Sequence, residues 1–320
     1  MRVFVAGASG ALGRPLVRRL VESGYETYGL ASKPESAKYI AKLGATPVIG
    51  NALDRMSVFD ALSESRPDYV IDQLTSLPSD PSEMPDRLPF DRKLRLEGGE
   101  NLFAAAQAHG VRRYVQQSSG FYLDGESQLA TEHSALRVQA PGHIGQSARM
   151  YAELERRALS SASLEAVALR YGFFYGPGTW YWNEGPLSER IRGGQCPIFG
   201  AGRGSFSFIH VEDAADATIA ALSAPAGIYN IVDDQPVAAA MFFAAFASWL
   251  GGPPPQLVDT AQTLERYGEE ALYYHNELSG SSNWKAKELL SLKTRISLGI
   301  LSVRKRTIRV KTQAATAHSQ

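Results

Sequence analysis

The chain has 320 residues, of which 44% are hydrophobic and 21% are charged, as in an ordinary soluble globular protein. Its 33 basic and 33 acidic side chains balance, so no overall charge favours nucleic acid or a membrane surface. No apolar run reaches the roughly 18 residues that span a bilayer. Cys196 is the single cysteine, which excludes an internal disulfide, predicts a packing role and favours a reducing, cytoplasmic location. A strand pattern begins at residue 2, so we expect no leader peptide.

The amino-terminal part alternates strand and helix patterns, which is typical of a parallel sheet covered on both faces. Strands are predicted at 2–6, 26–31, 46–49, 68–73, 112–117 and 165–170. Helices are predicted at 11–23, 34–43, 55–64, 90–109 and 147–160. Four prolines between residues 77 and 89 predict a loop after the fourth strand. We therefore expect residues 1–170 to form a doubly wound α/β domain.

The pattern changes after residue 170. Glycine and aromatic residues crowd into 171–208, and a helix at 211–222, a strand at 227–232 and a helix at 236–250 follow. We expect 171–290 to form a smaller substrate-facing lobe, interleaved with the first domain. The segment 291–320 contains the run Arg304-Lys305-Arg306 and a polar end, which predict a basic, disordered tail.

Three glycines with the spacing G-x-x-G-x-x-G follow the first strand and precede the first helix. Gly7 allows a tight turn, Gly10 allows phosphates to approach the backbone, and Gly13 lets the helix pack against the strand. Backbone N–H groups and the positive end of a helix suit a pyrophosphate. The motif therefore predicts a dinucleotide site; the alternative is a glycine-rich turn without a ligand.

With this loop, five later segments resemble the extended short-chain dehydrogenase/reductases of the NAD-dependent epimerase/dehydratase family. These segments are 50–54 (GNALD), 115–119 (VQQSS), 169–178 (LRYGFFYGPG), 208–215 (FIHVEDAA) and 227–231 (GIYNI). Their order and spacing match from residue 1 to about 290. The resemblance implies a Rossmann domain with NAD or NADP and a carboxy-terminal lobe that sets the choice of a small-molecule substrate.

The resemblance also assigns residues to the coenzyme. The pyrophosphate would lie on the loop, which comprises Gly7, Ser9, Gly10, Ala11, Leu12 and Gly13. The adenine would lie on Asn51, Ala52 and Leu53, although the family usually has Asp where Asn51 stands. The nicotinamide ribose would lie on Gln73, Leu74 and Thr75. Tyr171, at the carboxyl end of the sixth strand, is a further coenzyme-binding candidate. A serine at the end of the fifth strand usually orients the reacting oxygen, which makes Ser118 and Ser119 catalytic candidates.

The end of the second strand bears on the choice between NAD and NADP. An acid there usually bonds the adenosine ribose hydroxyls and repels a 2′-phosphate. Here the strand ends in Ser32 and Lys33, with no acid before Glu35. A hydroxyl and an ammonium suit a phosphate, so we expect NADP to be preferred. The alternative is that Lys33 is a solvated loop residue and the coenzyme is NAD.

The family's proton-transfer pair, Y-x-x-x-K, is missing, because no tyrosine in the chain has lysine four residues later. One alignment puts Tyr151 in the tyrosine slot and Glu155 in the lysine slot. The other puts Ser147 in the tyrosine slot and Tyr151 in the lysine slot. A tyrosine without a nearby cation is a poor base at neutral pH, and a glutamate nearby would raise its pKa further. Tyr151 therefore stays one catalytic candidate among several.

Aromatic side chains cluster where a substrate would bind. Tyr122, Phe174, Tyr175 and Trp180 are the pocket candidates. His210 could transfer a proton near neutral pH, although the family has a histidine there for structural reasons. Asp233 and Asp234 would point to opposite faces of a strand, and no other metal-ligand spacing occurs, so we expect no metal.

Three functions remain open at this stage. The first is an NAD(P)-dependent oxidoreductase acting on a small carbonyl or alcohol without the usual pair. The second is a redox-neutral epimerase, dehydratase or isomerase that uses bound NAD(P). The third is a non-catalytic NADPH sensor. By analogy with the family, a homodimer would pair through the helices predicted at 90–109 and 147–160.

Overall fold

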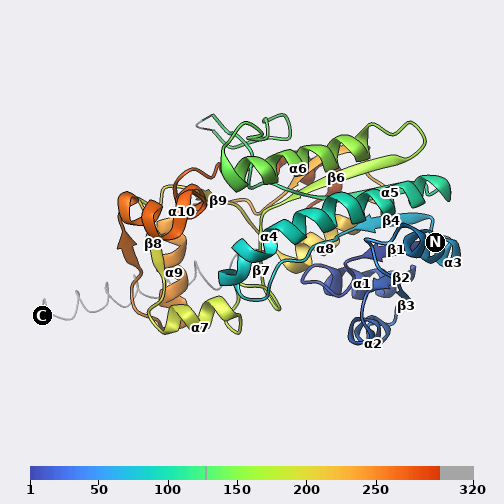
Figure 1. The fold of residues 1–320 in the computed structure, drawn as a ribbon, viewed down its shortest axis with the longest axis horizontal. Helices are drawn as coiled ribbons and strands as arrows, with labels where there is room; N and C mark the ends of the chain where they lie inside the picture. The colour runs from blue at the N-terminus through green and yellow to red at the C-terminus, as the bar shows by residue number, and fades with distance from the viewer. Residues whose placement is uncertain (127, 296–320) are drawn as a thin grey trace, which may run out of the picture.

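A parallel seven-stranded sheet forms the main body of the structure, a computed structural model that describes residues 1–126 and 128–295 (Figure 1). Its strand order is β11-β6-β5-β4-β1-β2-β3. The strands are β1 (Arg2–Ala6), β2 (Glu26–Ala31), β3 (Thr46–Ile49), β4 (Tyr69–Asp72), β5 (Arg113–Ser119), β6 (Glu165–Tyr171) and β11 (Gly227–Ile231). The order reverses between β1 and β4, so the carboxyl ends of these two strands form the switch point at which such sheets bind ligands.

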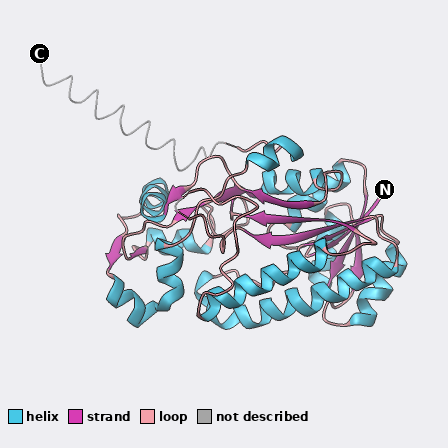
Figure 2. Ribbon diagram, turned by 90° about the horizontal axis from the view of Figure 1, so that it is seen from above, coloured by secondary structure: helices cyan, strands magenta, loops and turns pink. Residues whose placement is uncertain are grey.

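Both faces of the sheet are covered by helices because successive strand residues point in opposite directions. In β1, Val3 and Val5 belong to one apolar core, while Phe4 and Ala6 belong to the other. The first face carries α1 (Gly13–Glu22), α2 (Pro34–Lys42), α8 (Val211–Ala220) and α11 (Trp284–Leu290). The second face carries α3 (Arg55–Ser65), α5 (Gly99–Ala108) and α6 (Gly142–Leu159). Figure 2 shows the sheet between these two layers of helices. The predicted Rossmann architecture is therefore confirmed.

A smaller lobe lies at the carboxyl edge of the sheet, toward which the strand arrows point (Figure 2). The parallel pair β7 (Phe173–Tyr175) and β10 (Phe208–His210) joins it to the main body. Its other elements are α7 (Pro186–Arg192), β8 (Pro197–Phe199), β9 (Ser205–Phe206), β12 (Val237–Ala238), α9 (Ala239–Leu250), β13 (Gln256–Val258) and α10 (Thr260–Asn276). A third core made largely of aromatic rings holds this lobe together, and it contains Phe206, Phe208, Phe242 and Phe246. Cys196 is buried in the same core, as its interpretation as a packing residue required.

Two elements that we had placed in the smaller lobe belong to the main body. The strand at 227–231 pairs with β6 in the main sheet, and the helix at 211–220 packs against α1. Both elements bury apolar side chains, such as Ile231 and Ala214, in the first core. Hydrophobic periodicity identified the elements but carries no information on which core they join. The interleaving is therefore deeper than expected, and the domain boundaries at 170 and 290 stay predictions.

The segment predicted as a proline-rich loop at 77–89 is partly helical. A short 3-10 turn η1 (Pro81–Glu83) leads into α4 (Met84–Lys93), and a π-helical turn η2 (Leu94–Gly98) connects α4 to α5. Pro85 stands in the first turn of α4, where the N–H group that proline lacks would have no helical partner. The helix predicted at 90–109 therefore starts earlier, and α6 likewise starts at Gly142 instead of 147.

The predicted disordered tail lies mostly outside the described residues, which end at Arg295. Residues 291–295 are attached to the main body. The backbone N–H of Leu292 donates to the carbonyl of Ala286, and Arg295 forms an ion pair with Asp213 on α8. None of the helices within the described residues is long and apolar enough to cross a membrane.

Candidate active site

The glycine loop lies at the switch point between β1 and β4. Close backbone contacts require glycine at two of its three glycine positions. A Cβ atom at Gly7 would lie 2.2 Å from the carbonyl oxygen of Gln73, and one at Gly13 would lie 2.1 Å from the carbonyl oxygen of Gly7. A Cβ at Gly10 would come no closer than 3.2 Å to other atoms. Gly7 and Gly13 are therefore required for packing, whereas Gly10 leaves the outer side of the loop open.

The amino terminus of α1 is free to bind an anion. No side chain caps it, and its first turn contains no acidic residue. Ser9, Ala11 and Leu12 lie in the loop that leads into it. Uncapped N–H groups and the helix dipole favour a phosphate at this position. The residues present thus fit the pyrophosphate of a dinucleotide.

A buried polar cluster lies next to the loop at the end of β4. The Tyr171 hydroxyl is 2.7 Å from Thr218 Oγ1 and accepts a hydrogen bond of 3.3 Å from Gln73 Nε2. Gln73 Oε1 is buried without a hydrogen-bond partner among the described residues. An orphaned acceptor is costly to bury, so it indicates a missing donor at the place assigned to the nicotinamide side of the coenzyme. Leu74, in contrast, is buried in the second core.

Thr75 forms a hydrogen bond with one member of a buried ion pair that sequence reasoning missed. Its hydroxyl donates to Asp91 Oδ1 over 2.9 Å, and the N–H of Ser76 donates to the same oxygen over 2.6 Å. Asp91 Oδ2 pairs with Arg95 Nε at 2.7 Å, and both side chains are buried. The i,i+4 spacing of Asp91 and Arg95 is a sequence signal for such a pair, but it falls where we expected a loop to give way to a helix.

The turn after β3 contains the residues that were predicted to hold the adenine. Asn51 Oδ1 accepts a hydrogen bond from the N–H of Leu53, and the Ala52 carbonyl accepts one from Asn101. The Asn51 side chain therefore shapes the turn, and Asn101 holds it to α5.

Ser32 and Lys33 lie exposed between β2 and α2. Arg14, which sequence reasoning missed, lies in the first turn of α1, and its side chain reaches toward Tyr39 on α2. Its Nε donates to the Ser9 carbonyl at 2.8 Å, and its guanidinium carbon lies 5.1 Å from the centre of the Tyr39 ring. Arg14 therefore places a cation beside this end of the loop.

The two serines at the end of β5 face different partners. Ser118 Oγ donates to Glu155 Oε1 over 2.6 Å. Glu155 also accepts two hydrogen bonds of 2.7 Å from Arg170, and both charged side chains are less than a tenth exposed. Ser118 is therefore part of a buried ionic network that joins β5, α6 and β6.

Ser119 faces Tyr151, with which it forms a hydrogen bond. Burial raises the pKa of Tyr151, and the guanidinium of Arg95, 5.5 Å from the ring centre, acts in the opposite direction. We had expected Glu155 to raise this pKa, but that carboxylate points to Arg170. Burial is the main cause instead.

Tyr122 contacts both residues that the two alignments place in the tyrosine slot. Its ring stacks on Tyr151 with centroids 5.7 Å apart, and its hydroxyl forms a hydrogen bond with Ser147. The same hydroxyl lies 2.8 Å from the hydroxyl of Tyr274 on α10. Tyr274 follows Tyr122 by 152 residues, so no local pattern could have revealed this contact.

The four side chains predicted to line the substrate pocket do not all lie together. Tyr122 and Tyr175 belong to the aromatic core of the lobe, but Phe174 lies on the other side of β7, against Tyr171 and the first core. Trp180 donates its indole N–H to the carbonyl of Pro78 and so ties the lobe to the loop after β4.

His210 has a structural contact of its own. Its Nδ1 accepts a hydrogen bond from the N–H of Glu212 and caps α8, and burial lowers its pKa. A histidine that accepts a hydrogen bond at Nδ1 serves its helix as the neutral form, which agrees with the structural alternative weighed for it.

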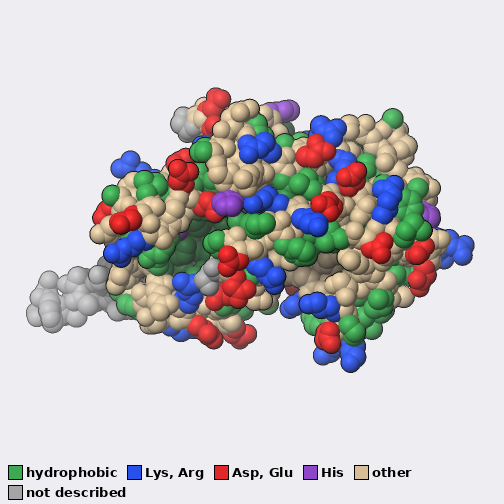
Figure 3. Space-filling view, viewed as in Figure 1, with side chains coloured by type: hydrophobic (Ala, Val, Ile, Leu, Met, Phe, Trp, Pro, Cys, Tyr) green, Lys and Arg blue, Asp and Glu red, His purple; other side chains and the backbone are tan. Residues whose placement is uncertain are grey.

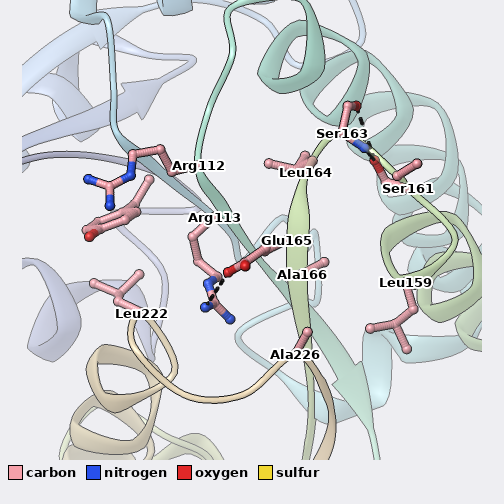
Figure 4. A pocket seen from close by; sticks show the side chains of 12 residues that line it. Arg112, Arg113, Leu159, Ser161, Ser163, Leu164, Glu165, Ala166, Leu222 and Ala226 are labelled. Carbon is pink, nitrogen blue, oxygen red and sulfur yellow. Dashed lines mark hydrogen bonds and ion pairs between the residues drawn. The ribbon is translucent and has the colours of Figure 1, made fainter.

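The structure has hollows in two different places. The surface is recessed between the smaller lobe and the main body, where hydrophobic side chains are visible (Figure 3). A cavity of about 520 Å³ lies instead at the amino ends of β4, β5 and β6, lined by residues such as Tyr69, Arg113 and Glu165 (Figure 4). Because ligands of doubly wound sheets bind at the carboxyl ends of the strands, this second cavity is separate from the candidate site.

Comparison with known proteins agrees with this geometry. Residues 3–232 match the NAD dependent epimerase/dehydratase family. The chain belongs to this family. A 3-diazoavenalumate denitrifying reductase from Streptomyces sp is 36% identical over 92% of this chain and 96% of its own length. A farnesyl-dihydroquinoline-1-oxide ketoreductase from Stigmatella aurantiaca is 26% identical over 74% of this chain and 70% of its own length.

Solved structures show the same fold. The UDP-glucose 4-epimerase of Thermus thermophilus, in complex with NAD, has a TM-score of 0.73 and 24% identity and covers 94% of this chain and 96% of its own. The inferred family and fold are therefore confirmed, as is the expectation of an enzyme of a nicotinamide-dependent class. The homodimer stays a prediction.

Proposed function

We propose that this protein is a reductase that uses NADPH to reduce a small aromatic carbonyl compound. The observation that carries the proposal is the open, uncapped amino terminus of α1 behind Gly10, next to the orphaned oxygen of Gln73. The loop from Gly7 to Gly13 would hold the pyrophosphate. Asn51, Ala52 and Leu53 would hold the adenine, and Gln73, Thr75 and Tyr171 the nicotinamide side.

The bound coenzyme would supply a hydride. The chain's own residues would orient the acceptor, exclude water and provide a proton. Aromatic rings dominate the lobe that faces the coenzyme edge, and they favour a planar, apolar substrate. Ser119 and Tyr151, which hydrogen-bond one another, are proposed to lie beside the reacting oxygen, whereas Ser118 is proposed to act only through Glu155.

The preference for NADPH over NADH is proposed from two cations: Arg14, which bonds the glycine loop, and Lys33, which follows β2, where a 2′-phosphate would lie. Replacing either by alanine should weaken NADPH binding about tenfold, since a charge-assisted hydrogen bond to a phosphate contributes ~1.5 kcal/mol. NADH binding should stay unchanged. Lys38→Ala, at an exposed lysine on α2, is the matched control. Calorimetry gives both dissociation constants, and tighter binding of NADH by the unmodified protein would refute the preference.

An aromatic diazo compound is a second candidate substrate, favoured by the relative that is 36% identical and is named a denitrifying reductase of a diazo compound. When an aryl diazonium ion accepts a hydride at the carbon, the C–N bond breaks and N₂ leaves with its electron pair. No alkoxide forms, so this reaction needs no tyrosine–lysine pair. Consumption of NADPH with release of N₂ from an arenediazonium salt would support this substrate class.

Two assays separate these proposals from the redox-neutral and non-catalytic alternatives. Loss of absorbance at 340 nm with aromatic aldehydes, ketones or quinones indicates a reductase. Conversion of a substrate without net change at 340 nm would favour epimerisation or dehydration. Tight NADPH binding with no turnover on any panel would favour a sensor.

A further inference from the structure

Three hydroxyl groups from distant parts of the chain form one hydrogen-bonded cluster beside the predicted coenzyme site. Tyr122 lies in the loop after β5, Ser147 lies on α6, and Tyr274 lies on α10 of the smaller lobe. The hydroxyls of Tyr122 and Tyr274 are 2.8 Å apart, and Ser147 bonds the same oxygen of Tyr122. Tyr122 and Ser147 are only 6% and 4% exposed, so water competes little for these groups.

Burial raises the pKa of both phenols, and the hydrogen bonds with Ser147 and Tyr274 act against that rise at Tyr122. In the pair of Tyr122 and Tyr274 either oxygen can be the donor. A phenolic oxygen can accept two hydrogen bonds and still donate its own proton. The cluster therefore allows both neighbours to donate to the oxygen of Tyr122, an arrangement that leaves the proton of Tyr122 for a third partner.

This cluster stands where the family's proton-transfer tyrosine is absent. In the alignment that matches Glu155 to the family, Ser147 takes the tyrosine slot and Tyr151 the lysine slot. The Ser147 side chain is short, and it is already engaged with Tyr122. Tyr122 stacks on Tyr151 at a ring angle of 27° and thus carries a phenol into the same space from a different element.

We propose that Tyr122 is the proton donor of the reaction, and that Ser147 and Tyr274 are positioning residues that hold its hydroxyl and stabilise its anion. Two hydrogen bonds would thereby perform the electrostatic role that lysine performs in the rest of the family. The inference rests on the proposed carbonyl reductase function.

In the proposed step, the carbonyl is reduced to an alcohol. Hydride adds to the carbonyl carbon, and the C=O π pair moves to oxygen. That oxygen takes the proton of Tyr122 as the phenolic O–H bond breaks. The product is an alcohol, the coenzyme is left oxidised, and water returns the proton to the phenolate.

Turnover of an aromatic aldehyde, ketone or quinone with NADPH is the first test. Tyr122→Phe should lower kcat at least 100-fold, with KM and the dissociation constant of NADPH changed less than threefold. Ser147→Ala and Tyr274→Phe should lower kcat about tenfold and move the alkaline limb of the pH profile upward. Tyr267→Phe, an exposed tyrosine on α10, is the matched control.

A second test needs no substrate. The absorbance of tyrosinate at 295 nm is titrated for the unmodified protein and for Tyr122→Phe, and the difference gives the ionisation of Tyr122. Ser147→Ala and Tyr274→Phe should each raise that pKa. An unchanged or lower value in both variants would overturn the assignment of the donors.

The results of these tests distinguish a failure of the proposed reductase function from a failure of the role proposed for Tyr122. If the unmodified protein binds no pyridine nucleotide, the proposed function itself fails. If it binds NADPH and reduces carbonyls while Tyr122→Phe keeps more than a tenth of kcat, or while Tyr151→Phe loses more than Tyr122→Phe, only the role of Tyr122 is overturned. Reduction of arenediazonium salts with no reduction of carbonyls would likewise count against a proton donor.

Discussion

Glu155 and Glu153 on α6 allow a matched test of how burial governs an ion pair. Each lies within 2.8 Å of an arginine nitrogen, Arg170 in the first case and Arg156 in the second. The side chains of the Glu155 pair are 7% and 4% exposed, whereas those of the Glu153 pair are 43% and 65% exposed. The two positions thus differ mainly in access to water.

Glu155→Ala should destabilise the protein by about 3–5 kcal/mol, because it leaves the charge of Arg170 buried without its bidentate partner. It also removes the acceptor of Ser118. Glu153→Ala should cause no resolvable change, because an exposed pair is screened by solvent. Urea unfolding followed by circular dichroism gives both free energies. Equal losses in the two variants, or a loss below ~1 kcal/mol for Glu155→Ala, would refute the reasoning.

Two further predictions concern the loop and the smaller lobe. Gly13→Ala should weaken coenzyme binding at least tenfold, since its methyl group would lie 2.1 Å from the Gly7 carbonyl oxygen; Gly193→Ala, with neighbours no closer than 3.5 Å, should leave binding unchanged, and equal affinities would contradict this. His275 is stacked on Phe243, and burial lowers its pKa to about 4. Because the pKa of His275 is lower in the folded than in the unfolded protein, neutral His275 contributes to the free energy of unfolding above pH 6.5, and this contribution is lost as the pH falls toward 4. Between pH 7.5 and pH 5 the free energy of unfolding, measured by thermal unfolding, should therefore fall by up to ~2 kcal/mol less in His275→Phe than in the unmodified protein. An equal fall in both proteins would exclude His275 as its cause.

Much of the fold could be predicted because its signals are local. The alternation of strand and helix, and the glycines at 7, 10 and 13, depend on neighbours within one or two turns. The helix α4 was missed because proline was interpreted as a breaker, although Pro85 stands in the first turn, where a helix tolerates proline, and α4 also continues through Pro89. The strand β11 was placed in the wrong part because its pairing with β6 joins residues about 60 positions apart.

The candidate site was less predictable for the same physical reason. The coenzyme loop is one continuous segment, and its chemistry can be derived from its own residues. The hydroxyl cluster of Tyr122, Ser147 and Tyr274 depends on how the smaller lobe closes against the sheet. Pairing of Ser118 with Glu155 likewise depends on the packing of α6 against β5, which periodicity does not specify.

The repeated passage of the chain between its two parts limits how it can be divided. The backbone leaves the sheet after β6, returns at β10 to build α8 and β11, leaves again for α9 and α10, and returns at α11. A truncation near residue 171 would strip an edge strand and two helices from the coenzyme-binding part and expose its apolar core. Grafting a different specificity onto this scaffold would therefore require two separate insertions to be exchanged together, one between β7 and β10 and one between β11 and α11.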